Sequence, residues 1–352
     1  MGTARGFGIE VSALTQPIGR AVAILWLAAA IAMVATAVSL FVWPTKWWMV
    51  GAAAVALSQL AVMTSWHDAR FGTVANAIAL VGVAYGFLNS GPYSFKTAYG
   101  LDVQQALSKS HPRQILTEAD LAFLPAPVAR YIRLSGAVGQ PRVYNFRATF
   151  RGDIRSGPQA RWMPFTGEQH STIAPASRLF LMGASMFAVP IEAFHRYVGT
   201  AATMKVKVLS LVPMVDAAGP AMNRGETVTM FNDMCIFAPG ALADPSIEWL
   251  HSDGNTVRAA FRNAGNTIQA DLIFNDAGEL INFVSDDRAA GSADGKSFVK
   301  SRWWTPVSDY RSFGDHRLAS RGEAQWDKPS GRFTYLRLTI DRVDYNVASP
   351  GP

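Results

Sequence analysis

The chain has 352 residues, and its 32 basic and 26 acidic side chains give a formal net charge of +6. The basic excess is scattered, without a run of Lys or Arg that would follow a phosphate backbone, which argues against nucleic acid as a partner. The one cysteine, Cys235, excludes an intrachain disulfide and a four-cysteine zinc site.

Charged residues are rare in the first hundred positions and frequent afterwards. Those of the first hundred are Arg5, Glu10, Arg20, Lys46, Asp68, Arg70 and Lys96. Without these five basic and two acidic side chains, the totals of 32 and 26 leave 27 and 24 for the remainder, which is nearly neutral. This uneven distribution indicates two regions that have to be interpreted separately.

Three uncharged apolar stretches, 21–42, 47–66 and 71–88, lie between these charges. At roughly 1.5 Å per residue, each is long enough to cross the hydrocarbon core of a bilayer as a helix. Aromatic residues of the kind favoured at membrane interfaces flank the stretches: Trp43, Trp47, Trp48, Trp66, Tyr93 and Tyr99. The sequence therefore predicts a multi-pass anchor over residues 1–92, with the lipid bilayer as its partner.

The distribution of basic residues around the stretches predicts an orientation. Arg5, Arg20 and Arg70 fall on one side of the membrane, and Lys46 and Lys96 fall on the other. By the positive-inside rule, we expect the N-terminus on the cytoplasmic side of a bacterial inner membrane. Three crossings then put the following domain on the periplasmic side.

Two features of the apolar stretches have alternative interpretations. Residues 35–37 fit the small-x-small pattern of a signal-peptide cleavage site, although the apolar run continues beyond them. The polar side chains Ser58, Gln59 and Asn76 either line a path or form hydrogen bonds between helices, and we favour the second. The absence of charge within the stretches argues against a transporter.

Residues 93–115 form a mixed polar stretch that contains His111-Pro112, and we expect a linker there. A globular domain is predicted over 116–348. It begins with a short helical segment, because Thr117 and Asp120 fit a capping box.

Most of this domain has the alternating pattern of β-strands. Apolar residues from Val257 to Phe261 and from Ile268 to Phe274 alternate with polar ones, and Asn263-Ala264-Gly265-Asn266 supplies a turn between them. A second turn at 275–278 leads into the next apolar run. The predicted strands lie at about 143–208, 257–261, 268–274, 280–284 and 333–347.

One segment, Pro220–Phe237, has the pattern of a helix, because a proline that follows a glycine suits the first helical position. Its apolar residues include Val228, Phe231 and Cys235, and its polar stripe consists of Glu226, Thr229 and Asp233. The fold predicted for the chain is therefore α+β: three transmembrane helices followed by a mostly antiparallel sheet packed on one or two helices.

Four runs of residues are specific enough to compare with known families: LPAPV at 124–128 followed by Arg130-Tyr131, WMPFTGEQ at 162–169, ETVTMFNDMC at 226–235 and SDDR at 285–288. In this order they resemble an uncharacterised bacterial family, a domain of unknown function that often follows a few membrane spans. The resemblance runs from about 117 to 347 and implies no activity, catalytic residue or ligand. A looser analogy of layout is to the half-open β-cups of bacterial lipoprotein carriers, which enclose an apolar cavity.

Several polar residues are candidates for a site. Glu226 and Asp233 are seven residues apart on one helix face, so the pair either performs acid–base chemistry or binds a cation, or it belongs to a solvated or hydrogen-bonded face. About 10 Å separates such side chains unless something bridges them. We favour the solvated or hydrogen-bonded face.

The cluster Asp286, Asp287 and Arg288 either holds a polar head group or metal or forms ion pairs at the rim of the sheet. Alternation sends Asp286 and Asp287 to opposite faces. His195 has no second histidine at a ligand spacing, so neither a metal site nor a cofactor is predicted. Nucleophile and phosphate-binding motifs are absent from the sequence.

Methionine and aromatic residues gather in the first half of the domain and suit a deformable apolar pocket, although core packing explains the same residues and is the interpretation that we favour for them. The candidate ligand-binding residues are Met182, Met186, Met204, Met230, Phe231 and Met234. The leading hypothesis is a membrane-tethered domain that binds a lipid or another apolar molecule between the sheet and the Pro220–Phe237 helix. The alternatives are an envelope enzyme of hydrolase type, in which Glu226, Asp233 and Asp287 converge, and a structural or sensory domain for an unidentified protein partner.

Overall fold

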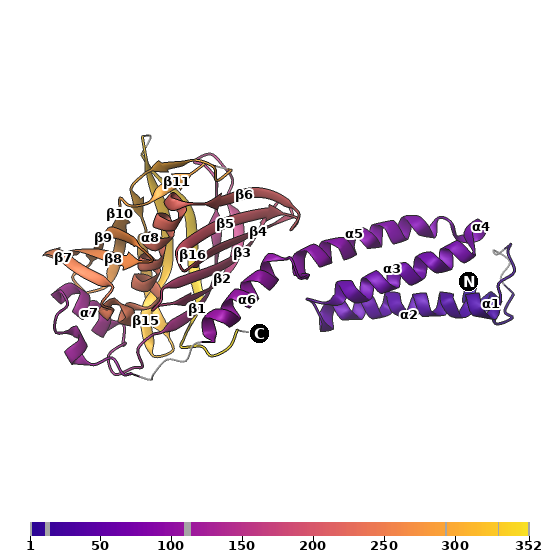
Figure 1. Ribbon diagram of the computed structural model, residues 1–352, viewed down its shortest axis with the longest axis horizontal. Helices are drawn as coiled ribbons and strands as arrows, with labels where there is room; N and C mark the ends of the chain where they lie inside the picture. Colours follow the sequence, from indigo (N-terminus) through magenta and orange to yellow (C-terminus); the bar gives the residue numbers. More distant parts are fainter. Residues whose placement is uncertain (1, 11–14, 109–113, 293, 330, 351–352) are drawn as a thin grey trace. The chain divides into compact units, whose positions relative to one another are not determined.

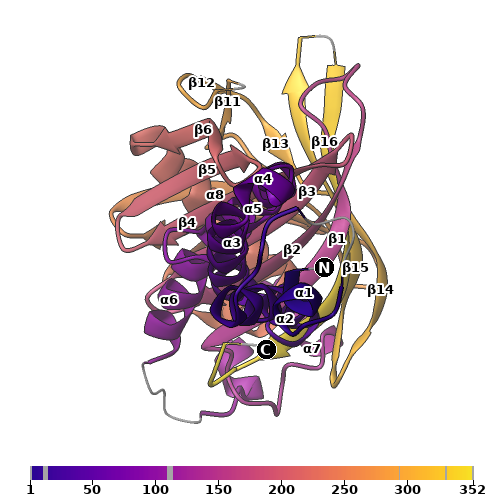
Figure 2. The same ribbon diagram turned by 90° about the vertical axis from the view of Figure 1, so that its right-hand side faces the viewer.

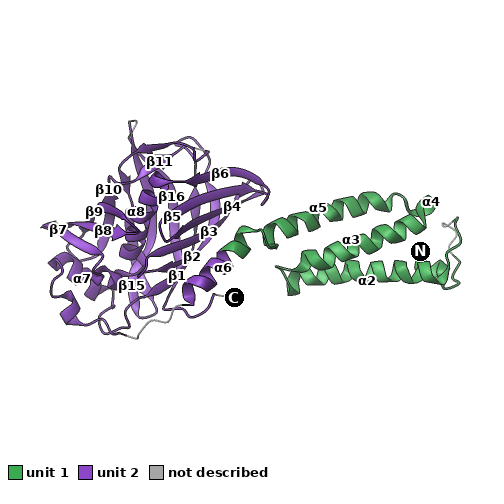
Figure 3. Cartoon of the chain, in the orientation of Figure 1, with its two compact units in different colours: residues 1–98 green, residues 99–352 purple. Residues whose placement is uncertain are grey.

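The computed structural model describes residues 2–10, 15–108, 114–292, 294–329 and 331–350. The chain divides into two compact units, Met1–Ala98 and Tyr99–Pro352 (Figure 3). We describe each unit by itself.

The first unit is helical. Its elements are α1 (Gly2–Gly6), α2 (Arg20–Val42), α3 (Trp47–Thr64), α4 (Trp66–Ala69) and α5 (Gly72–Ser90). Three helices of the described residues, α2, α3 and the helical stretch that begins with α5, are long and apolar enough to cross a membrane. They coincide with the three predicted spans, which supports membrane association.

The polar side chains inside these spans bond to one another. The Ser58 hydroxyl donates a hydrogen bond to Oδ1 of Asn76 (2.8 Å), and Nδ2 of Asn76 donates to Oε1 of Gln59 (3.0 Å). These bonds join α3 to α5, which agrees with the interhelical role that we favoured.

The second unit starts inside helix α6 (Phe95–Leu107), which occupies much of the predicted linker. The rest of that stretch, with His111-Pro112, lies outside the described residues. Helix α6 is fixed to the sheet, because Arg196 donates to both carboxylate oxygens of Asp102 at 2.7 and 3.0 Å. The hydroxyl of Tyr99 lies 2.8 Å from Nδ1 of His170.

His170 makes this contact sensitive to pH. Its side chain is buried, and burial lowers its pKa from 6.5 to about 4, although Glu168 acts in the opposite direction. In the unfolded chain the imidazole takes up a proton near pH 6.5, whereas in the folded domain it stays neutral until about pH 4. The domain therefore loses stability as pH falls from about 6.5 towards 4.

We expect the free energy of unfolding to fall by about 2 kcal/mol between pH 7.5 and pH 5 through this residue. His170→Gln removes the titrating group. The change in unfolding free energy between the two pH values should therefore be smaller in this variant than in the natural protein, by the same amount of about 2 kcal/mol. Urea unfolding of both proteins, followed by circular dichroism at the two pH values, measures the difference. Equal pH dependence would show that His170 does not carry the effect.

After α6, a short 3₁₀ helix η1 (Glu118–Leu121) and helix α7 (Ala126–Leu134) precede the sheet. Thr117 and Asp120 form the predicted capping box at the start of η1. The first half of the sheet consists of β1 (Asn145–Ile154), β2 (Met163–Thr172), β3 (Ser177–Met186), β4 (Val189–Val198), β5 (Ala201–Val208) and β6 (Val212–Ala218). These strands pair in sequence as an antiparallel meander.

The second half of the sheet follows helix α8 (Pro220–Phe237) and the short η2 (Pro239–Ala243). Its strands are β7 (Ile247–Asp253), β8 (Thr256–Asn263), β9 (Asn266–Phe274), β10 (Leu280–Ser285), β13 (Trp303–Trp304), β14 (Val307–Phe313), β15 (His316–Lys328) and β16 (Gly331–Tyr345). β11 (Ala289–Gly291) and β12 (Phe298–Lys300) form a separate small ribbon. β16 pairs with β1 and joins the two halves into one antiparallel sheet that curves around α8 (Figures 1 and 2).

The predicted α+β fold is confirmed, including its central hairpin and helix. β8 and β9 meet at Asn263 and Asn266, and the two residues between them have positive φ, as a tight hairpin turn requires. Helix α8 has the predicted ends. Gly219, with φ +97°, supplies the left-handed backbone before Pro220.

Helix α8 lies inside the curved sheet, so every residue from Gly225 to Phe237 is buried. On one side the Phe231 ring stacks on Phe261 with centroids 5.3 Å apart, and on another Phe237 packs 5.6 Å from Phe146. The polar stripe of this helix therefore faces protein and a cavity, so it is hydrogen-bonded and not solvated.

Candidate functional site

A cavity of about 440 Å³ lies between α8 and the concave face of the sheet. Part of its wall is one row of residues that face each other across successive strands, Phe150, Met182, Ala193, Val206 and Val215, with Gly167 between Phe150 and Met182 in the register. These side chains point inward because alternate residues of each strand share a face. The row is apolar throughout.

Gly167 has a specific place in this wall. A Cβ atom there would lie 2.7 Å from the Phe150 ring and 2.8 Å from the Phe180 ring. Its absence lets the two rings, whose centroids are 5.4 Å apart, meet across the middle strand. The glycine of the WMPFTGEQ run therefore shapes the cavity.

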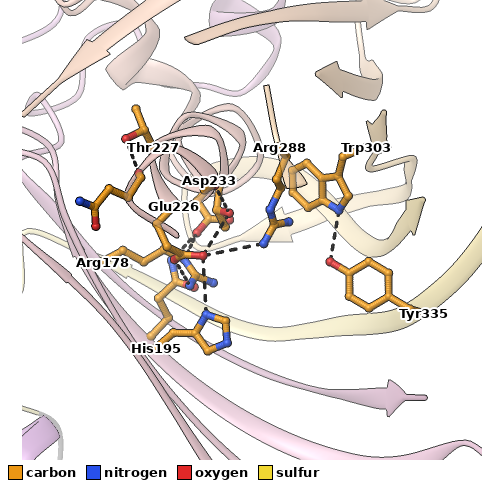
Figure 4. A network of polar contacts seen from close by, with 12 residues as sticks. Arg178, His195, Glu226, Thr227, Asp233, Arg288, Trp303 and Tyr335 are labelled. Atoms are coloured by element: carbon orange, nitrogen blue, oxygen red, sulfur yellow. Dashed lines mark hydrogen bonds and ion pairs between the residues drawn. The ribbon is translucent and has the colours of Figure 1, made fainter. Parts of the chain in front are cut away.

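One end of the cavity is strongly polar. Arg178 on β3 donates from Nε to Oδ2 of Asp233 (2.6 Å) and from Nη1 to Oε2 of Glu226 (3.1 Å). Both carboxylates come from α8, and the guanidinium bridges them in the way that the seven-residue spacing requires (Figure 4). Nε2 of Gln169 donates a further bond to Oδ2 of Asp233 (2.8 Å). We call Arg178, Glu226 and Asp233 the buried triad.

The two carboxylates of the buried triad differ electrostatically. Burial would raise the pKa of Glu226, but the charge of Arg178, together with His195 and Arg288, holds it well below its usual value. Burial raises the pKa of Asp233 and outweighs the contribution of Arg178. Glu226 is therefore the carboxylate that stays charged in this environment.

The second oxygen of Glu226 faces two more polar groups of the cavity wall. Nδ1 of His195 lies 3.6 Å from Oε1, and Nη2 of Arg288 lies 3.8 Å from it, so both are beyond direct hydrogen-bond distance. Arg288 also lies over the Trp303 ring, with 4.1 Å between its guanidinium carbon and the ring centroid. This arrangement leaves Glu226, His195 and Arg288 at the cavity surface, with space between them in which a polar group of a ligand can form hydrogen bonds.

The predicted ligand-binding residues fall into three groups. Met182 and Met204 line the cavity. Met230, Phe231 and Met234 are fully buried in the core on the sides of α8 that do not line it. Met186 is 45% exposed near the end of β3 and is not part of the wall.

The predicted polar cluster also divides. Glu226, Asp233, His195 and Arg288 come together at the cavity. Asp286 instead pairs with Arg302 (2.7 Å). Asp287 accepts from Arg224 (2.6 Å) and from the backbone N–H of Gln269 (2.7 Å).

The two aspartates follow the end of β10, outside the strand, and form ion pairs away from the cavity wall. Asp287 does not converge with Glu226 and Asp233, as the enzyme hypothesis required. Within the described ranges, no group of three or more His, Cys, Asp or Glu side chains is placed to hold a metal ion.

Sequence reasoning missed the residue on which the polar end depends, Arg178, together with the roles of Gln169 and Trp303. Gln169 ends the WMPFTGEQ run, so its position was available as a signal. Arg178 carries no motif, and only strand register places it opposite α8, where its neighbour on β4 is Tyr197 and on β2 is Ser171.

Comparison with curated proteins gives no match. Among solved structures, one similar chain is a domain from Vibrio parahaemolyticus that is described as an outer membrane lipoprotein-sorting protein. It shares 10% sequence identity with a TM-score of 0.32, over 57% of this chain and 85% of that chain. The family described as "Family of unknown function (DUF6544)" matches residues 114–338, more than half of the chain, and the chain therefore belongs to this family.

Proposed function

We propose that the domain binds an acyl chain or a similar apolar molecule in the cavity between α8 and the sheet. The observation that carries the proposal is the cavity itself, with about 440 Å³ of space and walls of Phe, Met, Val and Ala side chains. Small-molecule sites commonly measure about 300–1,000 Å³ and combine apolar walls with a few placed polar groups. This cavity has both features.

The polar end favours an amphiphile over a pure hydrocarbon. Glu226 and Asp233 are offset by Arg178 and Arg288, so the formal charges of the end balance. The long contacts of Oε1 of Glu226 to His195 and Arg288 leave room for a polar group of the ligand. In the proposed complex the tail lies along the Phe150 to Val215 row, and the head group meets Glu226 and Arg288.

The membrane helices support a lipid as the ligand, because they anchor the chain where lipids are abundant. We further propose that the anchor lies in a bacterial inner membrane and that the domain works on its periplasmic side. This orientation follows the excess of Arg5, Arg20 and Arg70 over Lys46 and Lys96.

Native mass spectrometry of the full chain, released from detergent, tests the proposal. We expect one lipid adduct per chain that persists after loosely attached lipids are stripped, because a ligand enclosed by α8 dissociates slowly. Delipidated protein should take up one added oleate or monoolein molecule. A bare chain mass, combined with no uptake of either compound, would contradict the proposal.

A further inference from the structure

Two hairpin tips of the sheet expose large apolar side chains. The turn between β3 and β4 presents Phe187, which is 76% exposed, next to Met186. The turn between β5 and β6 presents Leu211, which is 59% exposed, between Leu209 and Met214. One turn follows β3 and the other follows β5. In an antiparallel meander these two strands run in the same direction, so their turns lie at the same end of the sheet.

The backbone of these tips is unfavourable for the residues that occupy it. Phe187 and Ala188 form a two-residue turn between Met186 and Val189, and their φ angles are +52° and +63°. Leu209 and its neighbour Ser210 also have positive φ, +53° and +55°. Asn and Gly adopt this conformation most readily, so a largely exposed Phe187 and a partly exposed Leu209 there cost conformational energy that little burial offsets.

The tips adjoin the apolar end of the cavity. Its lining includes Ala184 on β3 and Val206 on β5, each three residues before its tip. The Arg161 guanidinium lies 5.7 Å from the centre of the Phe187 ring. Exposed apolar residues with nearby cationic ones are typical of segments that lie in a membrane interface.

We propose that these two tips, Phe187 with Met186 and Leu209 to Met214, insert into the surface of the bilayer in which the chain's own helices are anchored. The occupant is a bilayer because the anchor holds the domain next to one at high effective concentration. Contact with lipid removes the exposed apolar area from water, which accounts for Phe and Leu at turns that suit Asn and Gly. The contact does not require a ligand in the cavity.

Site-specific fluorescence in nanodiscs tests this proposal on the full chain. The only native cysteine, Cys235, is buried, so Phe187→Cys and Leu211→Cys each create one reactive thiol for an environment-sensitive dye. Leu250→Cys on β7 is the matched control, because Leu250 is also an exposed apolar residue, at 41%. Far-ultraviolet circular dichroism verifies that each variant is folded.

At 187 and 211 the dye should emit at shorter wavelength than at 250, and doxyl-labelled lipids in the nanodisc should quench it. Emission and quenching equal to those at 250 would overturn the proposal. A shift to shorter wavelength without quenching would also overturn it, because it would indicate contact with protein, such as a second copy of the chain.

Discussion

Arg178→Met is expected to destabilise the globular domain by about 3–5 kcal/mol, because it leaves two buried carboxylates without their cation. Arg178 is 7% exposed, Glu226 1% and Asp233 5%, so water cannot replace the lost charge. Arg178 is the main cause that lowers the pKa of Glu226, so in its absence burial disfavours the charged form of both carboxyls, and each must either stay charged without its cation or take up a proton. A loss of this size is comparable to the whole stability of many domains.

Urea unfolding of the full chain in detergent, followed by the β-sheet circular dichroism signal, measures this loss. The triple variant Arg178→Met, Glu226→Gln, Asp233→Asn should regain most of it, because no unpaired charge remains. Arg262→Met breaks an exposed ion pair with Glu248 and should cost less than about 1 kcal/mol. An Arg178→Met protein as stable as the Arg262→Met control would show that the buried triad is not an ion-pair network.

Val206→Trp is expected to abolish ligand binding while the domain remains folded. Val206 lines the cavity between Ala193 and Val215 in the apolar row, and an indole there occupies space proposed for the acyl chain. The cavity is already empty of side chains, so the larger ring meets less resistance than in a packed core. Labelling by a photoreactive fatty acid should fall by about tenfold or more, which corresponds to about 1.4 kcal/mol of binding free energy.

Lys205→Trp is the matched control for this experiment. Residue 205 is the next position on β5, faces the opposite side of the sheet and is half exposed. The same indole there should leave labelling close to that of the natural protein. Equal loss in both variants would mean that the tryptophan disturbs the strand rather than fills the cavity.

The sheet and its helix were largely predictable because their signals are local. Alternation on either side of Asn263-Ala264-Gly265-Asn266 determines a hairpin, and Gly219-Pro220 marks the start of α8 by backbone geometry alone. Helix α6 was missed because its polar composition resembles that of a linker. Its buried residues Tyr99 and Val103, four apart, were the available signal.

The site was only half predictable because its parts are far apart in sequence. The spacing of Glu226 and Asp233 indicated a shared face, but Arg178 lies 48 residues before the first of them and 55 before the second. Among the methionines, sequence cannot distinguish Met204 in the cavity wall from Met230 in the core. A helix enclosed on all sides has no single apolar face that would mark the cavity.

The location of the photoreactive acyl probe on the full chain tests the central claim most directly. Peptide mapping after cross-linking should place adducts on β3 to β5 and α8, at residues such as Met182 and Met204. The membrane helices should carry fewer adducts than these elements, although lipid surrounds them. Adducts confined to residues 20–90, with none on the sheet or α8, would contradict the claim that the cavity of this domain holds the lipid.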